Sequence, residues 1–154
     1  MPGKVSPKPA GYPSLTPYII VRDATRAIEF YRTVFGAVER MRLAGPGGRI
    51  GHAELTIGDA VLMLADEAPE HGAVAPQPDR AGSVSLHLYV DDADAVVRAA
   101  ESAGAKLLRP IETKFYGDRM ASITDPFGHI WHVSTHVEDV PPEEIERRAA
   151  ALSK

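Results

Sequence analysis

The sequence contains one pattern twice, and this duplication limits the folds open to the chain more than any other feature. The segment YIIVRDATRAIEFYRTVFGAVERM aligns with HLYVDDADAVVRAAESAGAKLLRP, so that Val21 corresponds to Val90 and Gly36 to Gly104. The period is too long for a solenoid, whose repeats usually span about 20 to 50 residues. The pattern therefore indicates a duplicated module.

Each copy begins with an alternating apolar strand that leads into an amphipathic helix. In the first copy, Asp23 is a natural N-cap and Gly36 a natural C-terminal cap. In the second copy, the cap is Asp92 or Asp91 and the helix ends at Gly104. The apolar residues of the first helix recur at the helical period and predict its buried face. They are Ala27, Phe30, Tyr31, Val34 and Phe35.

Three strands follow each predicted helix. In the first copy they span residues 37–44, 49–57 and 60–66, and the Gly-Asp pair at 58–59 makes a two-residue hairpin turn. In the second copy they span residues 105–112, 118–124 and 129–136, and the DPFG sequence at 125–128 predicts a type I turn. Each module is therefore β-α-β-β-β, and the fold class is α+β.

These elements predict how the chain is divided. Residues 1–14 form a mobile, proline-rich arm, 15–66 the first module and 67–82 a linker. Residues 83–136 form the second module, and 137–154 a tail with a short helix whose first turn is rich in proline and glutamate.

Charge and composition exclude several classes of function. The net charge is −4 and no dense run of Lys or Arg is present, so we expect no binding to nucleic acid or to a membrane surface. Without cysteine, the chain has no thiol nucleophile, disulfide or Cys-type zinc site. No apolar run approaches the ~18 residues of a membrane span, and the N-terminus lacks the pattern of a secretory signal. We therefore expect a cytoplasmic protein.

The side chains of a strand alternate between two faces, and the two faces of the central strands differ in composition. One set is almost entirely apolar and is expected to pack beneath the helices. The other set mixes hydroxyls, imidazoles and aromatic rings with aliphatic groups, which is typical of a ligand cleft. A solvated face or a dimer contact is the alternative. The candidate site residues on this second face are Thr16, Tyr18, Met63, Ser85, His87 and His132.

The paired modules, the VRDATRAIEFYRTVFGA segment and the DPFGH turn resemble the vicinal oxygen chelate superfamily. This group includes glyoxalase I, ring-cleaving dioxygenases, fosfomycin-resistance enzymes and bleomycin-binding proteins. The segments GHAELTIGDAVLMLADE and FYGDRMASITDPFGHIW are similar to its PhnB-like members. The resemblance covers residues 14–138. It implies a curved mixed sheet around a cleft, and a homodimer in which modules are sometimes exchanged between chains.

The resemblance also implies positions for metal ligands. Metal-dependent relatives carry His, Glu or Gln near the middle of the first and last strands of each module. The corresponding residues here are Thr16, Met63, Ser85 and His132. Only His132 is a good ligand for a divalent ion, so we expect no metal cofactor. The alternative is a displaced site in which His87, His132 and Glu54 hold Zn²⁺ or Fe²⁺.

The loop that enters strand 118–124 supplies further candidates, because this segment often borders the cleft in the superfamily. Phe115 and Tyr116 are placed to stack on a planar ligand, and Asp118 and Arg119 to pair with its polar groups. The alternative is an exposed loop with a local Asp–Arg contact.

These residues predict a metal-independent small-molecule binding protein, with a drug or metabolite held in the cleft of a homodimer. His52 and Glu54 share the strand face expected toward the cleft, and Glu54 and Asp118 would complement a cationic ligand. The alternative is a lyase, isomerase or dioxygenase acting on a small oxygenated substrate, with His132 and Glu54 as candidate catalytic residues. His132 is then a general base or a ligand of the displaced metal site.

Overall fold

The structure is a computed structural model that describes residues 3–80 and 82–153, and its chain divides into two units between Ala75 and Pro76. In the first unit, β1 (Tyr18–Val21) leads to α1 (Ala24–Phe35), followed by β2 (Val38–Ala44), β3 (Ile50–Ile57) and β4 (Ala60–Asp66). The strand order is β1-β4-β3-β2, with β1 parallel to β4 and the other pairs antiparallel. Short 3-10 turns lie at Pro46–Gly48 and Pro69–His71.

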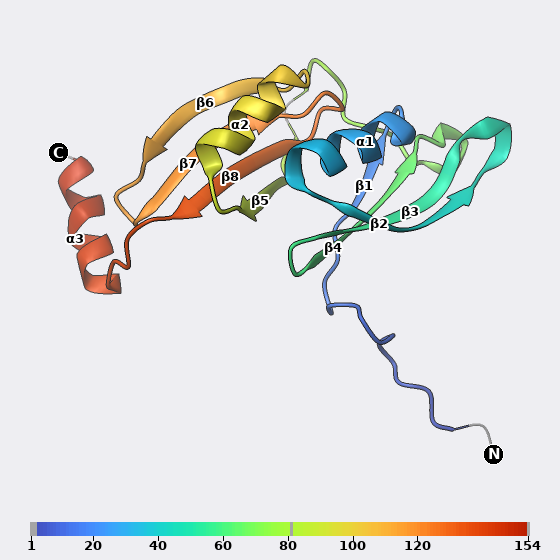
Figure 1. The fold of residues 1–154 in the computed structure, drawn as a ribbon, viewed down its shortest axis with the longest axis horizontal. Coiled ribbons are helices and arrows are strands. Elements are labelled where there is room, and N and C mark those ends of the chain that lie inside the picture. Colours follow the sequence, from blue (N-terminus) through green and yellow to red (C-terminus); the bar gives the residue numbers. More distant parts are fainter. Residues whose placement is uncertain (1–2, 81, 154) are drawn as a thin grey trace. The chain divides into compact units, whose positions relative to one another are not determined.

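The second unit repeats this topology (Figure 1). Its elements are β5 (Ser85–Tyr89), α2 (Ala93–Ser102), β6 (Lys106–Thr113), β7 (Asp118–Thr124), β8 (Ile130–His136) and the C-terminal helix α3 (Pro142–Leu152). The strand order is β5-β8-β7-β6, and β5 is parallel to β8. The prediction of an α+β fold built from two βαβββ modules is confirmed, with one four-stranded mixed sheet in each module.

The helix ends follow from their capping residues. The Asp23 carboxylate accepts a hydrogen bond from the backbone N–H of Arg26, and Gly36 ends α1 in the left-handed region at φ 68°. In the second module the N-cap is Asp92, which accepts from the N–H of Ala95. Each helix start is also tied to the last strand of its own module. The N–H of Ala24 donates to the Asp66 carboxylate at 2.7 Å, and the N–H of Ala93 donates to the Thr135 hydroxyl at 2.8 Å.

The alternation of faces along the strands agrees with the predicted division. Ile19, Leu64 and Val133 are buried, whereas His87 and Tyr89, on the opposite face of the second sheet, are exposed. The apolar set extends less far than expected, because Leu15 and Val84 precede β1 and β5 and are 87% and 75% exposed. No helix among residues 3–80 and 82–153 has the length and apolar character needed to cross a membrane.

Candidate functional site

One row of side chains crosses the polar face of the second sheet. Strand register aligns Arg109 of β6 with Ser122 of β7, Ser122 with His132 of β8, and His132 with His87 of β5. Because residues paired in register project from the same face, the four side chains form a continuous polar line. Two of the predicted residues, His87 and His132, lie in this line, and their ring centroids are 6.0 Å apart.

His132 is held at both ring nitrogens by serine hydroxyls. Nδ1 lies 2.7 Å from Ser122 Oγ and Nε2 lies 3.0 Å from Ser85 Oγ. Burial lowers the pKa of His132, and the nearby His87 and Arg109 lower it further. The imidazole is therefore neutral at pH 7, with one nitrogen donating and the other accepting a hydrogen bond. When Nε2 carries the proton, Ser85 accepts from it and its own hydroxyl hydrogen is left to donate to a ligand oxygen; in the other tautomer Ser85 donates to Nε2.

A pocket of about 200 Å³ lies beside this group, entirely within the second unit. Ser85, Ser122, His132 and Arg109 supply its polar wall. The apolar wall consists of Val84, Leu108 and Ile130. Among the residues that the structure describes, Arg109 has no ion-pair partner, so its charge is available to a ligand.

The equivalent row of the first sheet carries different chemistry. Register aligns Met41, Glu54, Met63 and Tyr18. The Glu54 carboxylate is only 4% exposed, and it accepts hydrogen bonds from the Tyr12 hydroxyl at 2.6 Å and from His52 Nε2 at 3.0 Å. These two hydrogen bonds lower the pKa of Glu54. The predicted pairing of His52 with Glu54 on one face is present, and side chains of its own module occupy one acceptor position on each carboxylate oxygen.

Tyr12 and Tyr18 complete this group. The Tyr18 hydroxyl lies 2.9 Å from His52 Nδ1, and burial, followed by the charge of Glu54, raises the pKa of Tyr18. The Arg40 guanidinium lies 4.5 Å from the centroid of the Tyr12 ring. Tyr12 belongs to the arm predicted at residues 1–14, so this part of the arm contacts the first module.

The residues at the four positions implied for metal ligands do not fit a divalent ion. Thr16 and Ser85 offer neutral hydroxyls and Met63 a thioether, all poor ligands for Zn²⁺ or Fe²⁺. His132 already has a serine hydroxyl at each nitrogen. Across residues 3–80 and 82–153, no three His, Asp or Glu side chains are grouped in a way that could hold a metal ion. The donors therefore do not favour metal chemistry at these positions.

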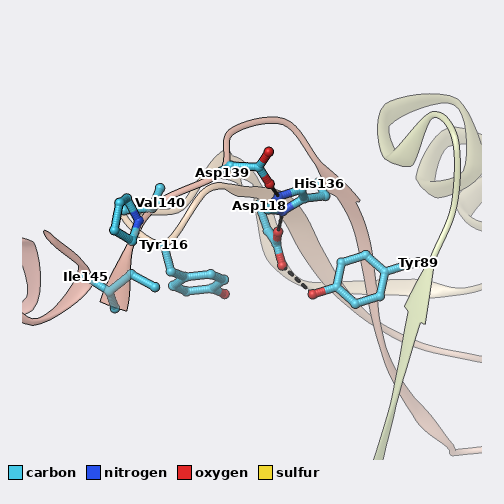
Figure 2. A pocket seen from close by; sticks show the side chains of 8 residues that line it. Tyr89, Tyr116, Asp118, His136, Asp139, Val140 and Ile145 are labelled. Atoms are coloured by element: carbon cyan, nitrogen blue, oxygen red, sulfur yellow. Dashed lines mark hydrogen bonds and ion pairs between the residues drawn. The ribbon is translucent and has the colours of Figure 1, made fainter. Parts of the chain in front are cut away.

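A second polar group lies where β5, β7 and β8 meet the C-terminal segment, as Figure 2 shows. Asp118 is 3% exposed and accepts hydrogen bonds from the Tyr89 hydroxyl at 2.7 Å and from His136 Nδ1 at 2.8 Å. His136 Nε2 lies 2.8 Å from Asp139. Hydrogen bonds to both carboxylates raise the pKa of His136. His136 was assigned no role from the sequence, although its spacing from His132 placed it on the same face.

The loop residues predicted to bind a ligand are divided between two sides of the sheet. The Tyr116 ring points toward this second polar group (Figure 2). The Phe115 ring packs edge-on against the Tyr116 ring, with the two centroids 5.2 Å apart. Arg119 follows Asp118 in β7 and therefore projects from the opposite face, where its guanidinium forms two hydrogen bonds with Asp94 of α2 at 2.6 and 2.9 Å. The structure thus places Arg119 on the helix side and commits it to Asp94, away from the face where it was expected.

Comparison with known proteins identifies the family. The sequence pattern of the Glyoxalase/Bleomycin resistance protein/Dioxygenase superfamily matches residues 13–133. The chain belongs to this superfamily. It is 40% identical to the Mycobacterium bovis protein Mb0911c over 92% of this chain and 93% of that protein.

Solved structures of the superfamily share the fold. TioX from Micromonospora sp. ML1 has a TM-score of 0.60 at 25% identity, covering 80% of this chain and 98% of TioX. A PhnB protein from Bacillus cereus has a TM-score of 0.63 at 16% identity, covering 80% of this chain and 99% of that protein. At this level of identity the PhnB protein is evidence for the fold alone, since one fold of this kind serves many functions.

Sequence reasoning missed Arg109 and Ser122 as members of the site. Both lie on strands whose faces were not sorted, and β6 is shifted in register on both sides of Arg109. A β-bulge changes which side chains share a face, so alternation alone could not have assigned Arg109. Ser122 could have been found, because the recognisable turn at 125–128 sets the pairing of the two strands that flank it. That pairing places Ser122, ten residues before His132, opposite it.

Proposed function

We propose that this protein is a metal-independent small-molecule binding protein of the superfamily, acting as a homodimer. The observation that carries the proposal is the pocket around His132. It combines an unpaired guanidinium, a neutral imidazole and the Ser85 hydroxyl, which can still donate when His132 Nε2 carries the proton, with an apolar wall. Such a pocket suits an organic molecule with an anionic or strongly polar oxygen, because Arg109 supplies charge while Ser85, oriented by His132, supplies a directed hydrogen bond.

Binding of simple aryl carboxylates tests the proposal. Benzoate and 1-naphthoate, titrated calorimetrically beside their primary amides, should bind more tightly than the amides by roughly tenfold, since a hydrogen bond to a charged group is worth about 1.5–3 kcal/mol. Arg109→Leu should abolish this preference. Arg98→Leu is the matched control, because Arg98 is an exposed arginine on α2 of the same module. Equal binding of acids and amides, or an equal loss in both variants, would contradict the proposal.

An enzyme is the second candidate, and the state of His132 favours it specifically. A neutral imidazole in contact with the Ser85 hydroxyl can accept a proton, as a general base must at neutral pH. Glu54 has its carboxylate held by Tyr12 and His52, which makes it less suited to proton transfer. Mass spectrometry of the ligand after incubation separates the candidates. A binding protein returns it unchanged, whereas an enzyme converts it and loses turnover in His132→Gln.

The homodimer in this proposal is supported by the outer strands of the two sheets. Val38 and Leu43 of β2, and Leu107 and Leu108 of β6, are between 42% and 61% exposed. Exposed apolar side chains on edge strands are usually covered by a partner. Light scattering coupled to size-exclusion chromatography should therefore give twice the 16.6 kDa chain mass. A monomer at micromolar concentration would contradict this part of the proposal.

A further inference from the structure

A second cavity, of about 450 Å³, lies within the second unit and has no lining residue in common with the pocket around His132. It opens between the ends of β5 and β8, the loop before β7, and the start of α3 (Figure 2). Its lining residues are Tyr89, Tyr116, Asp118, His136, Asp139, Val140, Pro141 and Ile145. The proposed function does not use this cavity.

The floor of the cavity is a buried carboxylate with spare hydrogen-bonding capacity. Burial alone would raise the pKa of Asp118, but the hydrogen bonds from His136 and Tyr89 outweigh it and keep the pKa below its ordinary value. Asp118 is therefore ionised at neutral pH. A carboxylate has about four acceptor positions, and the contacts with Tyr89 and His136 occupy one on each oxygen. Acceptor positions on both oxygens remain for a donor from a ligand.

The walls are aromatic and apolar. In Figure 2 the rings of Tyr116 and Tyr89 flank the Asp118 carboxylate, and Val140 and Ile145 close the side next to Tyr116. Tyr89 is 60% exposed, which is high for a large aromatic side chain with its hydroxyl fixed at 2.7 Å from a buried carboxylate. The electron-rich faces of tyrosine rings attract cations, and the effect is largest where water is partly excluded.

The net charge of the cavity is negative at any protonation state of His136. Two carboxylates, Asp118 and Asp139, share the single imidazole between them. On α3, Arg148 is held by Glu138 and Glu144 at 2.9 Å each, and Arg147 is paired with Glu144 at 2.6 Å. The positive end of the α3 dipole faces two acidic residues in its own first turn, which offset it.

We propose that this cavity is a binding site for an organic ammonium ion carried on an apolar or aromatic body, with Asp118 as the charge partner and Tyr89 and Tyr116 as the walls. The ammonium group donates to Asp118, and the body of the ligand packs against Val140, Pro141 and Ile145. The same chain then has two sites of opposite preference in one module, one for an anionic oxygen and one for an ammonium group.

The test uses phenethylammonium and the neutral phenethyl alcohol as probes on the full-length protein, with affinity measured by calorimetry and by NMR line shifts. The amine should bind at least about tenfold more tightly than the alcohol. Asp118→Asn should remove this difference. Asp94→Asn is the control, because the Asp94 carboxylate belongs to the same module but lies on the helix side of the sheet, where it pairs with Arg119.

A second pair of variants avoids the buried residue altogether. Ile145 lies on α3, which has no fully buried residue, so substitutions there leave the fold intact. Ile145→Lys should abolish amine binding by placing an ammonium group at the cavity, whereas Ile145→Gln should leave most of it. Equal affinity for amine and alcohol, undiminished amine binding in Ile145→Lys, or an equal loss in Asp94→Asn would each overturn the proposal.

Discussion

The turn before β8 depends on one buried carboxylate, and replacing it gives a sharp test of how the His132 pocket is positioned. Asp125 is 3% exposed. Its Oδ1 accepts from the backbone N–H groups of Phe127 and His129, and its Oδ2 accepts from Trp131 Nε1, all at 2.9 Å. His132 is the next residue. The carboxylate therefore fixes the turn, the indole and the start of β8 together.

Asp125→Asn keeps the shape of the side chain but cannot keep all three hydrogen bonds. If the amide oxygen stays on the backbone donors, the amide nitrogen faces Trp131 Nε1, and two donors oppose each other. A hydrogen bond to a charged group is worth about 1.5–3 kcal/mol, and an unsatisfied buried donor costs about 1–3 kcal/mol. We therefore expect a loss of about 3 kcal/mol in the free energy of unfolding. For a chain of this size that corresponds to a fall in Tm of roughly 6–12 °C.

Urea unfolding of four proteins measures the effect: wild type, Asp125→Asn, Trp131→Phe and the double variant. Trp131→Phe removes the opposing donor. Asp125→Asn should therefore cost at least about 1 kcal/mol less in the Trp131→Phe protein than in the wild type. Asp92→Asn is the control, since asparagine caps a helix as well as aspartate does, and its cost should be below about 0.5 kcal/mol. A loss below about 0.5 kcal/mol in Asp125→Asn, or additive effects in the cycle, would refute the reasoning.

Three further outcomes are expected. Gly117→Ala should cost roughly 3 kcal/mol or more in urea unfolding, because Gly117 has φ 100° and a Cβ would collide with the Glu138 carbonyl oxygen. Gly58→Ala, at φ 57° with open space around it, should cost only about 1–2 kcal/mol. The raised pKa of His136 means that its stabilising contribution is fully present below its ordinary pKa of 6.5 and is lost as pH rises through the raised value. The difference in Tm between wild type and His136→Gln should therefore shrink on going from about pH 6 to about pH 9, and a constant difference would contradict the assignment. Adding Zn²⁺, Ni²⁺, Mn²⁺ or Fe²⁺ should shift Tm by less than roughly 1 °C, whereas a large shift that disappears in His132→Ala would favour a chelating enzyme.

The fold could be predicted closely because each of its signals is local. The strand predicted at 118–124 is β7, and the strands predicted at 49–57 and 129–136 begin one residue before β3 and β8. Alternation, capping residues and turn residues act over a few positions, so a single sequence contains them in full. The duplication added an independent check, because the same elements had to appear twice.

The site was harder to predict, since it depends on register between strands that are distant in sequence. His132 and Ser85 were correctly placed on one face, and they are hydrogen bonded. Arg109 was missed because of the irregular β6–β7 register, and Arg119 was predicted to pair with polar groups of a ligand although it pairs with Asp94. Glu54 and Asp118 were predicted as charge complements for a cationic ligand, but the two hydrogen bonds that each accepts from its own module were not foreseen. Such partners cannot be identified from composition or spacing.

The two modules share one topology, but the register-aligned rows across their sheets carry different residues at equivalent positions. This difference predicts what happens when a residue of the second module is replaced by its counterpart from the first. Glu54 pairs with Met63 as Ser122 pairs with His132. Ser122→Glu would therefore bring a carboxylate next to His132, at a position that holds a buried carboxylate in the first module. An adjacent negative charge favours the imidazolium, so the pKa of His132 should rise, reversing the lowering caused by burial.

Titration of the His132 ring signals by NMR would measure this change. The Ser122→Gln variant is the control, because it adds similar bulk without charge. The same carboxylate would also supply a second good metal ligand, so Zn²⁺ should raise the Tm of Ser122→Glu but not of Ser122→Gln. An unchanged pKa of His132 in Ser122→Glu would mean that the two rows are not equivalent, and that the chemistry of one module cannot be transferred to the other through its register.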